Sequence, residues 1–223
     1  MNPLSIQQFL NEIEREGAAY DAVQTEYRRK RLNLESETAR LLQLLILSSR
    51  RCRVLEIGTS NGYSALWLAA ALRRIPNAHP LITIEREPQK ANQARQNLAR
   101  ADLAEWVEIR LGDATEVVTG LTGPFDTVFF DADRVSAPSQ LAILMPKLEA
   151  DVLLLADNAL SHPQEISGYL ETVKNLPEFT SMIVPIGKGL HVAHRLGPKL
   201  DAIWHHAFLT PRKQTPRSNS DST

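Results

Sequence analysis

The chain has 223 residues, a length that suits one compact α/β domain with room for a sizeable core. Its 25 Lys and Arg residues nearly balance 26 Asp and Glu residues, so the formal net charge of −1 gives no general attraction to nucleic acid or membranes. The single cysteine, Cys52, cannot form an internal disulfide, which favours a reducing compartment. The N-terminus lacks a signal-peptide pattern, and the apolar run at 41–47 is too short to span a bilayer. We therefore expect a cytoplasmic protein, with nucleic acid disfavoured as a partner and no membrane partner.

Helical periodicity marks the N-terminal part of the chain. Residues 1–35 are treated as an N-terminal helical segment of one or two helices, packed outside the main sheet. Its apolar positions at helical spacing include Ile6, Phe9, Leu10 and Ile13. Residues 36–49 form the next predicted helix, for which Ser36 is the expected N-cap.

From residue 53 the pattern alternates between short β-rich runs and helical segments. The predicted strands are 53–57, 81–85, 106–111, 126–131 and 152–156, and the predicted helices are 62–74, 88–101, 114–120 and 138–149. Apolar strands separated by helices indicate a parallel sheet covered on both faces. A helix at 163–175 and strands at 180–186 and 190–196 follow, and the short "GKG" connection makes the final pair antiparallel.

The sequence thus predicts a doubly wound, Rossmann-like α/β domain over residues 36–200, with a mostly parallel seven-stranded sheet and an antiparallel last strand. Residues 211–223 are rich in Pro, Ser and charge and have no apolar periodicity, whereas 201–209 could dock as a short helix. We expect residues 201–223 to form a largely disordered C-terminal tail.

The turn after the first strand, in "VLEIGTSNGYSALWLAAAL" (54–72), predicts a cofactor site. Its glycines, Gly58 and Gly62, would allow a sharp turn and a close ligand approach, but their spacing differs from the dinucleotide fingerprint. Glu56 at the strand end would repel phosphate and favour a cation. Glu85 ends the second strand, where an acid commonly binds ribose hydroxyls. S-adenosylmethionine (SAM), a nucleoside that carries positive charge, fits this pattern.

A set of oxygen ligands is predicted at the ends of the fourth and fifth strands. Asp131 ends one strand, and Asp157 and Asn158 follow its expected neighbour. Two carboxylates and an amide oxygen suit a hard divalent cation, Mg²⁺ first, with Mn²⁺ or Ca²⁺ as alternatives.

These motifs resemble those of the cation-dependent O-methyltransferases, the family of catechol and caffeoyl-CoA O-methyltransferases and their bacterial relatives. The resemblance runs from about residue 34 to residue 196 and rests on "LEIGTSNGYSALWLA", "ITIEREP", "GDA", "FFDADR" and "LLADN". It implies a class I SAM-dependent methyltransferase fold and a metal-dependent transfer of methyl from SAM to a hydroxyl of a small molecule, with a vicinal, catechol-like diol as the expected acceptor.

The resemblance also implies roles for individual residues. The methionine part of the cofactor would be held by Glu56, Gly58, Thr59 and Ser64, with a backbone contact near Leu34. Glu85 would bind the ribose, and Asp113 and Ala114 would lie along the adenine. Asp133 would lie near the amino group of the cofactor. The implied metal ligands are Asp131, Asp157 and Asn158, and the catalytic residues are Asp131 and Arg134.

The sequence departs from the family pattern at two positions. Arg134 stands where relatives often carry a lysine that accepts the proton, and a guanidinium cannot readily serve as a base. It could instead stabilise an oxyanion or hold an acidic substrate group, with the metal or another group, such as His162, assisting deprotonation. In "GKGL" (187–190), Lys188 stands where relatives usually have an acid, which leaves the identity of the acceptor open.

Other interpretations stay open at this point. One is a metal-independent methyltransferase of the same fold that acts on RNA or another small nucleophile. Another is a non-catalytic SAM-binding module. NAD-dependent oxidoreduction is disfavoured by the glycine spacing. The N-terminal helices could form a homodimer face or fold over the active site as a lid.

Overall fold

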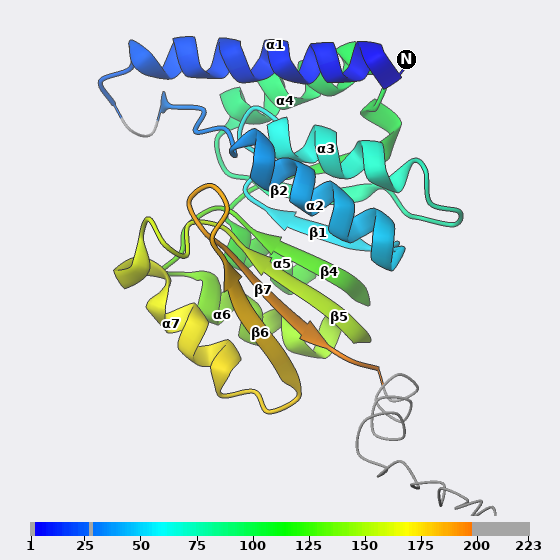
Figure 1. Ribbon diagram of the computed structural model, residues 1–223, viewed down its shortest axis with the longest axis vertical. Helices are drawn as coiled ribbons and strands as arrows, with labels where there is room; N and C mark the ends of the chain where they lie inside the picture. The colour runs from blue at the N-terminus through cyan, green and yellow to red at the C-terminus, as the bar shows by residue number, and fades with distance from the viewer. Residues whose placement is uncertain (1–2, 27–28, 198–223) are drawn as a thin grey trace, which may run out of the picture.

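A single seven-stranded sheet forms the centre of the molecule in the computed structural model, which describes residues 3–26 and 29–197 (Figure 1). The strand order is β3-β2-β1-β4-β5-β7-β6. The strands are β1 (Val54–Ile57), β2 (Leu81–Glu85), β3 (Val107–Leu111), β4 (Phe125–Phe130), β5 (Leu148–Ala156), β6 (Phe179–Val184) and β7 (Leu190–Arg195). Strands β1 to β5 pair in parallel, and β7 runs antiparallel to both β5 and β6. The predicted doubly wound fold with an antiparallel last strand is confirmed. The predicted tail, 201–223, lies outside the described residues.

Helices cover both faces of the sheet (Figure 1). They are α1 (Pro3–Ala22), α2 (Ser36–Ser49), α3 (Tyr63–Leu72), α4 (Pro88–Arg100), α5 (Ala114–Gly120), α6 (Ala137–Leu144) and α7 (Pro163–Lys174), with short 3₁₀ turns η2 (Ala104–Trp106) and η3 (Met145–Lys147). Helices α1 to α4 contribute to one hydrophobic cluster, and α5 to α7 contribute to a second. Along β4, Phe129 belongs to the first cluster, whereas Val128 and Phe130 belong to the second. This alternation is the period-two pattern of a strand that is buried on both faces.

The chain reaches α2 through a short connection that is fixed by hydrogen bonds. The two carboxylate oxygens of Asp21 accept hydrogen bonds from the backbone N–H groups of Arg31 (2.7 Å) and Leu32 (2.8 Å). Glu35, not Ser36 as expected, is the N-cap residue of α2, and Ser36 is its first helical residue. Glu35 has extended backbone angles and no side-chain capping bond, so its carboxylate is available for other contacts.

Most element boundaries lie within two residues of the sequence-based expectation, and two differ by more. Strand β5 begins at Leu148, four residues earlier than predicted, because Leu148 pairs with Phe125 across a register shift. The predicted helix 138–149 is α6 followed by the 3₁₀ turn η3. Within the described ranges, no helix combines the length and apolar character that crossing a membrane requires.

Candidate active site

The turn after β1 brings the ends of β1, β2 and β4 together. The backbone N–H groups of Gly58 and Thr59 donate to the carbonyl of Ile84 (3.0 and 3.2 Å). Gly58 has φ +109°, and a Cβ at this position would overlap the backbone carbonyl oxygen of Asp131. Gly58 was expected to allow a sharp turn and a close ligand approach; its positive φ bears out the turn, and the structure shows the carbonyl of Asp131 on the side where a Cβ would stand. Gly58 is therefore needed to seat Asp131 against the turn.

Glu56 is a fully buried acid at the base of this turn. Its Oε2 accepts from the hydroxyl of Thr83 (2.6 Å), which in turn lies 2.7 Å from the hydroxyl of Thr59. Its Oε1 is buried and has no hydrogen-bond partner among the described residues. Burial raises the pKa of Glu56 to about 7, and the neighbouring hydroxyls of Ser64 and Thr83 oppose this shift only in part. An unpartnered buried carboxylate oxygen is costly unless a donor, such as a ligand amino group, reaches it.

Glu85 ends β2 and organises the loop beside it. Its Oε2 accepts from the backbone N–H of Ser60 (2.7 Å), and its Oε1 accepts from that of Glu87 (2.9 Å). The hydroxyl of Ser60 donates to the carbonyl of Arg31 (2.5 Å), which ties the connection ahead of α2 to the cofactor turn. Each carboxylate oxygen keeps further acceptor capacity, so a ribose hydroxyl is a compatible additional donor.

The other expected cofactor residues differ in their surroundings. Asp113 is exposed and is the N-cap of α5, where its carboxylate accepts from the backbone N–H of Thr115 (2.9 Å) and Ala114 is the first helical residue. Leu34, Thr59 and Ser64 are buried. The Leu34 side chain belongs to the hydrophobic core, so only its backbone is a candidate for ligand contact.

Asp131, Asp157 and Asn158 are brought together as the topology requires. Phe130 pairs with Ala156, so the two aspartates leave adjacent parallel strands side by side. Asp157 is only 3% exposed; its Oδ2 accepts from Asn158 Nδ2 (2.8 Å), and no described residue bonds its buried Oδ1. Asn158 has φ +69° and its Oδ1 accepts from the hydroxyl of Ser161 (3.1 Å).

The two carboxylates repel one another in a poorly solvated place. Burial raises the pKa of Asp131 well above its usual range, and the charges of Asp157 and Glu56 add to that shift. Burial also raises the pKa of Asp157 to about 6, against the hydrogen bond at Asn158, which lowers it. Neighbouring carboxylates of this kind are relieved by a shared proton or by a cation.

The residues at this edge fit a hard cation. Within the part of the chain that the structure describes, no three His, Cys, Asp or Glu side chains form a ligand group, so a site would need the amide oxygen of Asn158. Two carboxylates and an amide oxygen, with Asp157 Oδ1 unsatisfied, are the ligand types that Mg²⁺ or Mn²⁺ prefers, with waters or ligand oxygens completing the shell.

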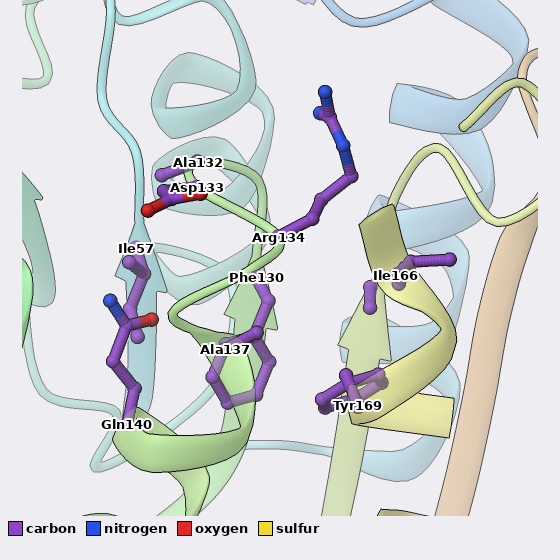
Figure 2. A pocket seen from close by; sticks show the side chains of 10 residues that line it. Ile57, Phe130, Ala132, Asp133, Arg134, Ala137, Gln140, Ile166 and Tyr169 are labelled. Carbon is purple, nitrogen blue, oxygen red and sulfur yellow. The ribbon is translucent and has the colours of Figure 1, made fainter. Parts of the chain in front are cut away.

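Asp133 and Arg134 follow Asp131 but engage other partners. Asp133 accepts from the backbone N–H of Val135 (3.1 Å) and the hydroxyl of Ser136 (2.6 Å). The Nε and Nη2 atoms of Arg134 both donate to Glu165 Oε2, at 2.9 and 2.7 Å. In Figure 2 the guanidinium extends away from the floor of a small pocket, about 10 Å³ in volume, which is room for roughly one water. The side chains of Phe130 and Tyr169 lie on that floor.

Three contributors were not anticipated as parts of the site. Thr83 donates to Glu56 from within a largely apolar strand. A hydroxyl residue at such a position is the sequence signal that could have indicated this hydrogen bond. Glu35 pairs with Lys188 at 2.8 Å, and Glu165 pairs with Arg134. These pairs join residues far apart in the chain, so local sequence gives no sign of them. His162 contacts the hydroxyl of Ser161 at 2.9 Å (Nδ1 to Oγ).

Comparison with known proteins matches this chain to O-methyltransferases. A family model described as O-methyltransferase matches residues 9–195. A catechol O-methyltransferase from Niastella koreensis is 34% identical over 133 residues, which are 58% of this chain and 59% of that protein. A catechol O-methyltransferase from Mycobacterium tuberculosis is 34% identical over 131 residues, 58% of each chain. The matched region thus covers less than two thirds of the length of these two relatives.

Solved structures extend the likeness over most of the chain. The O-methyltransferase from Bacillus cereus, in complex with SAH, superposes with a TM-score of 0.72 at 24% identity and covers 85% of this chain and 91% of that one, a likeness of fold. The O-methyltransferase TomG from Streptomyces achromogenes, involved in tomaymycin synthesis and in complex with SAM, superposes with a TM-score of 0.70 at 27% identity, covering 85% and 90%.

Proposed function

The chain belongs to the O-methyltransferase family, and on this premise we propose that it transfers a methyl group from SAM to a hydroxyl of a small molecule, assisted by a divalent cation. The observation that carries the proposal is the buried Oε1 of Glu56, which lacks a partner in the described residues at the end of β1. The amino group of SAM would supply the missing donor, and the relatives in complex with SAM or SAH support this choice. SAM supplies an activated methyl on a cationic sulfur.

The cofactor residues have complementary tasks. Glu56 receives a cationic group in a place from which water is excluded. Glu85 holds the backbone of the turn in place through Ser60 and offers its remaining lone pairs to the ribose. Asp113 caps α5 through one carboxylate oxygen, and its other oxygen would be available to the adenine.

Asp131, Asp157 and Asn158 would hold the divalent cation. A bound divalent cation lowers the pKa of a coordinated hydroxyl and fixes its direction. The three ligands orient the acceptor at the same sheet edge as the cofactor turn, since Asp131 packs directly on Gly58. Two adjacent hydroxyls would complete such a shell, which supports a vicinal diol as the acceptor.

The surroundings of the ligands favour an acceptor with an apolar ring. Val135 follows Arg134 and is 70% exposed, and Leu160 lies two residues after Asn158 and is 53% exposed. Exposed apolar side chains beside a polar site commonly contact a ligand. The guanidinium of Arg134 stays charged and is held by Glu165, so it is assigned an electrostatic role and not proton transfer.

The test combines cofactor binding with turnover. Calorimetry should show SAM binding to the wild-type protein and to Asp157→Ala. Methyl transfer should occur to a catechol and not to the matched phenol, and both EDTA and Asp157→Ala should reduce it by roughly a hundredfold.

Each part of the proposal has its own contrary result. Absence of SAM binding would overturn the whole assignment. Transfer that EDTA leaves unchanged would favour a metal-independent methyltransferase. Tight SAM binding without transfer to any acceptor would indicate a non-catalytic module.

A further inference from the structure

The β6–β7 turn is fixed against the segment that follows Asn158. The backbone carbonyl of Lys188 accepts from the N–H groups of Leu160 (2.9 Å) and Ser161 (3.1 Å). The neighbouring carbonyl of Gly189 accepts from the N–H of Ala159 (2.8 Å). Gly189 has φ +90°, and a Cβ there would press on Leu160. Lys188 is therefore held beside the oxygen ligands by backbone bonds, whatever its side chain does.

The other side of the turn packs on the start of α2 (Figure 1). Gly187 has φ +53°, and a Cβ there would overlap Thr38 and crowd the carboxylate of Glu35. Lys188 Nζ lies 2.8 Å from Glu35 Oε1. Glu35 Oε2 is buried and makes no hydrogen bond within the described ranges. The ammonium group is thus anchored by an acid that is not itself one of the proposed metal ligands.

Lys188 and Glu35 share one electrostatic cluster with the aspartates. The positive charge of Lys188 lowers the pKa of both Asp131 and Asp157, and the negative charge of Glu35 raises both. Arg134 also lowers the pKa of Asp157, but its guanidinium is paired with Glu165. Arg134 is therefore tied to an acid on α7, whereas Lys188 is paired with Glu35, whose charge acts on the same two aspartates.

We propose that Lys188 is a resident counter-cation of the Asp131–Asp157–Asn158 site, positioned by Glu35, and that it weakens the binding of a divalent cation there. This inference rests on the proposed metal-assisted function. An ammonium fixed near a divalent cation repels it, and at a partly buried site with an effective dielectric near 20 this repulsion changes affinity by roughly tenfold or more. Glu35 acts in the opposite direction, because it draws the ammonium toward itself and adds a negative charge.

The experiment measures Mn²⁺ binding by electron paramagnetic resonance on the full chain, with no turnover involved. Lys188→Met should bind Mn²⁺ about tenfold more tightly than the wild type, whereas Glu35→Gln should bind it more weakly. Lys188→Arg keeps the charge and should stay near the wild-type affinity. Lys174→Met removes the same charge from an exposed residue in the last turn of α7 and should change affinity less than about twofold.

The outcomes separate this inference from the function on which it rests. Binding that is lost in Asp157→Ala assigns the Mn²⁺ to this site. Equal affinities of the wild type and Lys188→Met would overturn the role of Lys188 and leave the metal site standing. No binding in the wild type or in Lys188→Met would overturn the metal proposal itself. Lys188→Gln gives a second neutral variant if the methionine disturbs folding, which circular dichroism reports.

Discussion

Glu56 shows how one residue combines a functional proposal with a cost in stability. The fold buries this acid completely, and burial raises its pKa from 4.5 to about 7. The folded state therefore favours the protonated form. Below pH 4.5 the acid is neutral in both states and costs little. As the pH rises from about 4.5 to about 7, only the unfolded chain ionises, so the free energy of unfolding falls across that window.

Glu56→Gln should remove this pH dependence, because the amide keeps the shape of the neutral acid and does not ionise. Relative to the wild type, the variant should gain about 2–3 kcal/mol in unfolding free energy between pH 4 and pH 8. Urea denaturation of both proteins across that range measures the difference, in which the titration of Asp131 and Asp157 largely cancels. A difference that is flat with pH would mean that folding leaves the pKa of Glu56 at its ordinary value.

Arg134 is paired with the carboxylate of Glu165, and this pairing favours a role for its positive charge. Its guanidinium donates twice to Glu165, and the family resemblance implies a proton-accepting lysine at this position. A charge-only role requires a cation here and nothing more specific. Arg134→Lys should therefore retain methyl transfer within about threefold in kcat, measured with a catechol acceptor. A loss greater than roughly a hundredfold would instead indicate a specific contact between the guanidinium and the acceptor.

At the scale of the elements, the hydrophobic pattern was sufficient to locate each of the strands that the structure describes. The family match confirms the resemblance to O-methyltransferases that the sequence motifs indicated. Boundaries were less predictable where tertiary pairing decides them. Strand β5 begins at Leu148 because Phe125 pairs with it; "LEAD" does alternate apolar and polar residues, but residues 148–149 were expected to belong to the preceding helix. The N-cap of α2 is Glu35, although Ser36 has the better capping side chain, because the backbone is still extended at Glu35 and its carbonyl accepts a helical bond from the N–H of Ala39.

The pairing of charges was the part of the site that the sequence could not supply. Strand ends and acid positions together predict that Asp131 and Asp157 meet, since adjacent parallel strands end at the same edge. Lys188 and Glu35 are separated by most of the chain, and only the packing of the β6–β7 turn on α2 brings them into contact. A glycine likewise gives no sign of what fills the space beside it. Gly58 makes the sharp turn that was expected, and the space where its Cβ would stand holds the carbonyl of Asp131.

Gly58→Ala tests this close approach between the β1 turn and the end of β4. The variant needs an alanine at φ +109° and overlaps the Asp131 carbonyl, so it should lose about 2–4 kcal/mol in unfolding free energy without any ligand. The matched control is Gly120→Ala at the end of α5, where a Cβ meets nothing within 4 Å. Its change should be within about 1 kcal/mol. Equal stabilities of the two variants in urea titrations would show that the turn relaxes around the added methyl.

At the scale of the whole molecule, two hydrophobic clusters join the helices to the sheet from opposite faces. The N-terminal segment shares one of them: Phe9, Leu10 and Ile13 of α1 are buried with residues of α2 and α3. The connection through Asp21 and Asn33 adds polar bonds to α1, from Asn33 Nδ2 to the carbonyl of Ile13 (3.2 Å) among others. A segment that is buried in this way should unfold together with the sheet, and the boundary expected near residue 35 should not appear as a separate transition.

Ile13→Ala measures that coupling. Ile13 is 1% exposed, so its truncation leaves a cavity between α1 and α3 and should cost about 3 kcal/mol in unfolding free energy. Glu16→Ala, on the exposed side of the same helix, should change stability by less than about 0.5 kcal/mol. Far-UV circular dichroism and tryptophan fluorescence should report one shared midpoint for Ile13→Ala, since Trp67 of α3 lies in the same cluster. Two separate midpoints, with part of the helical signal lost before the main transition, would instead show that α1 is an independent unit, which could open without disturbing the cofactor turn and would then suit a lid.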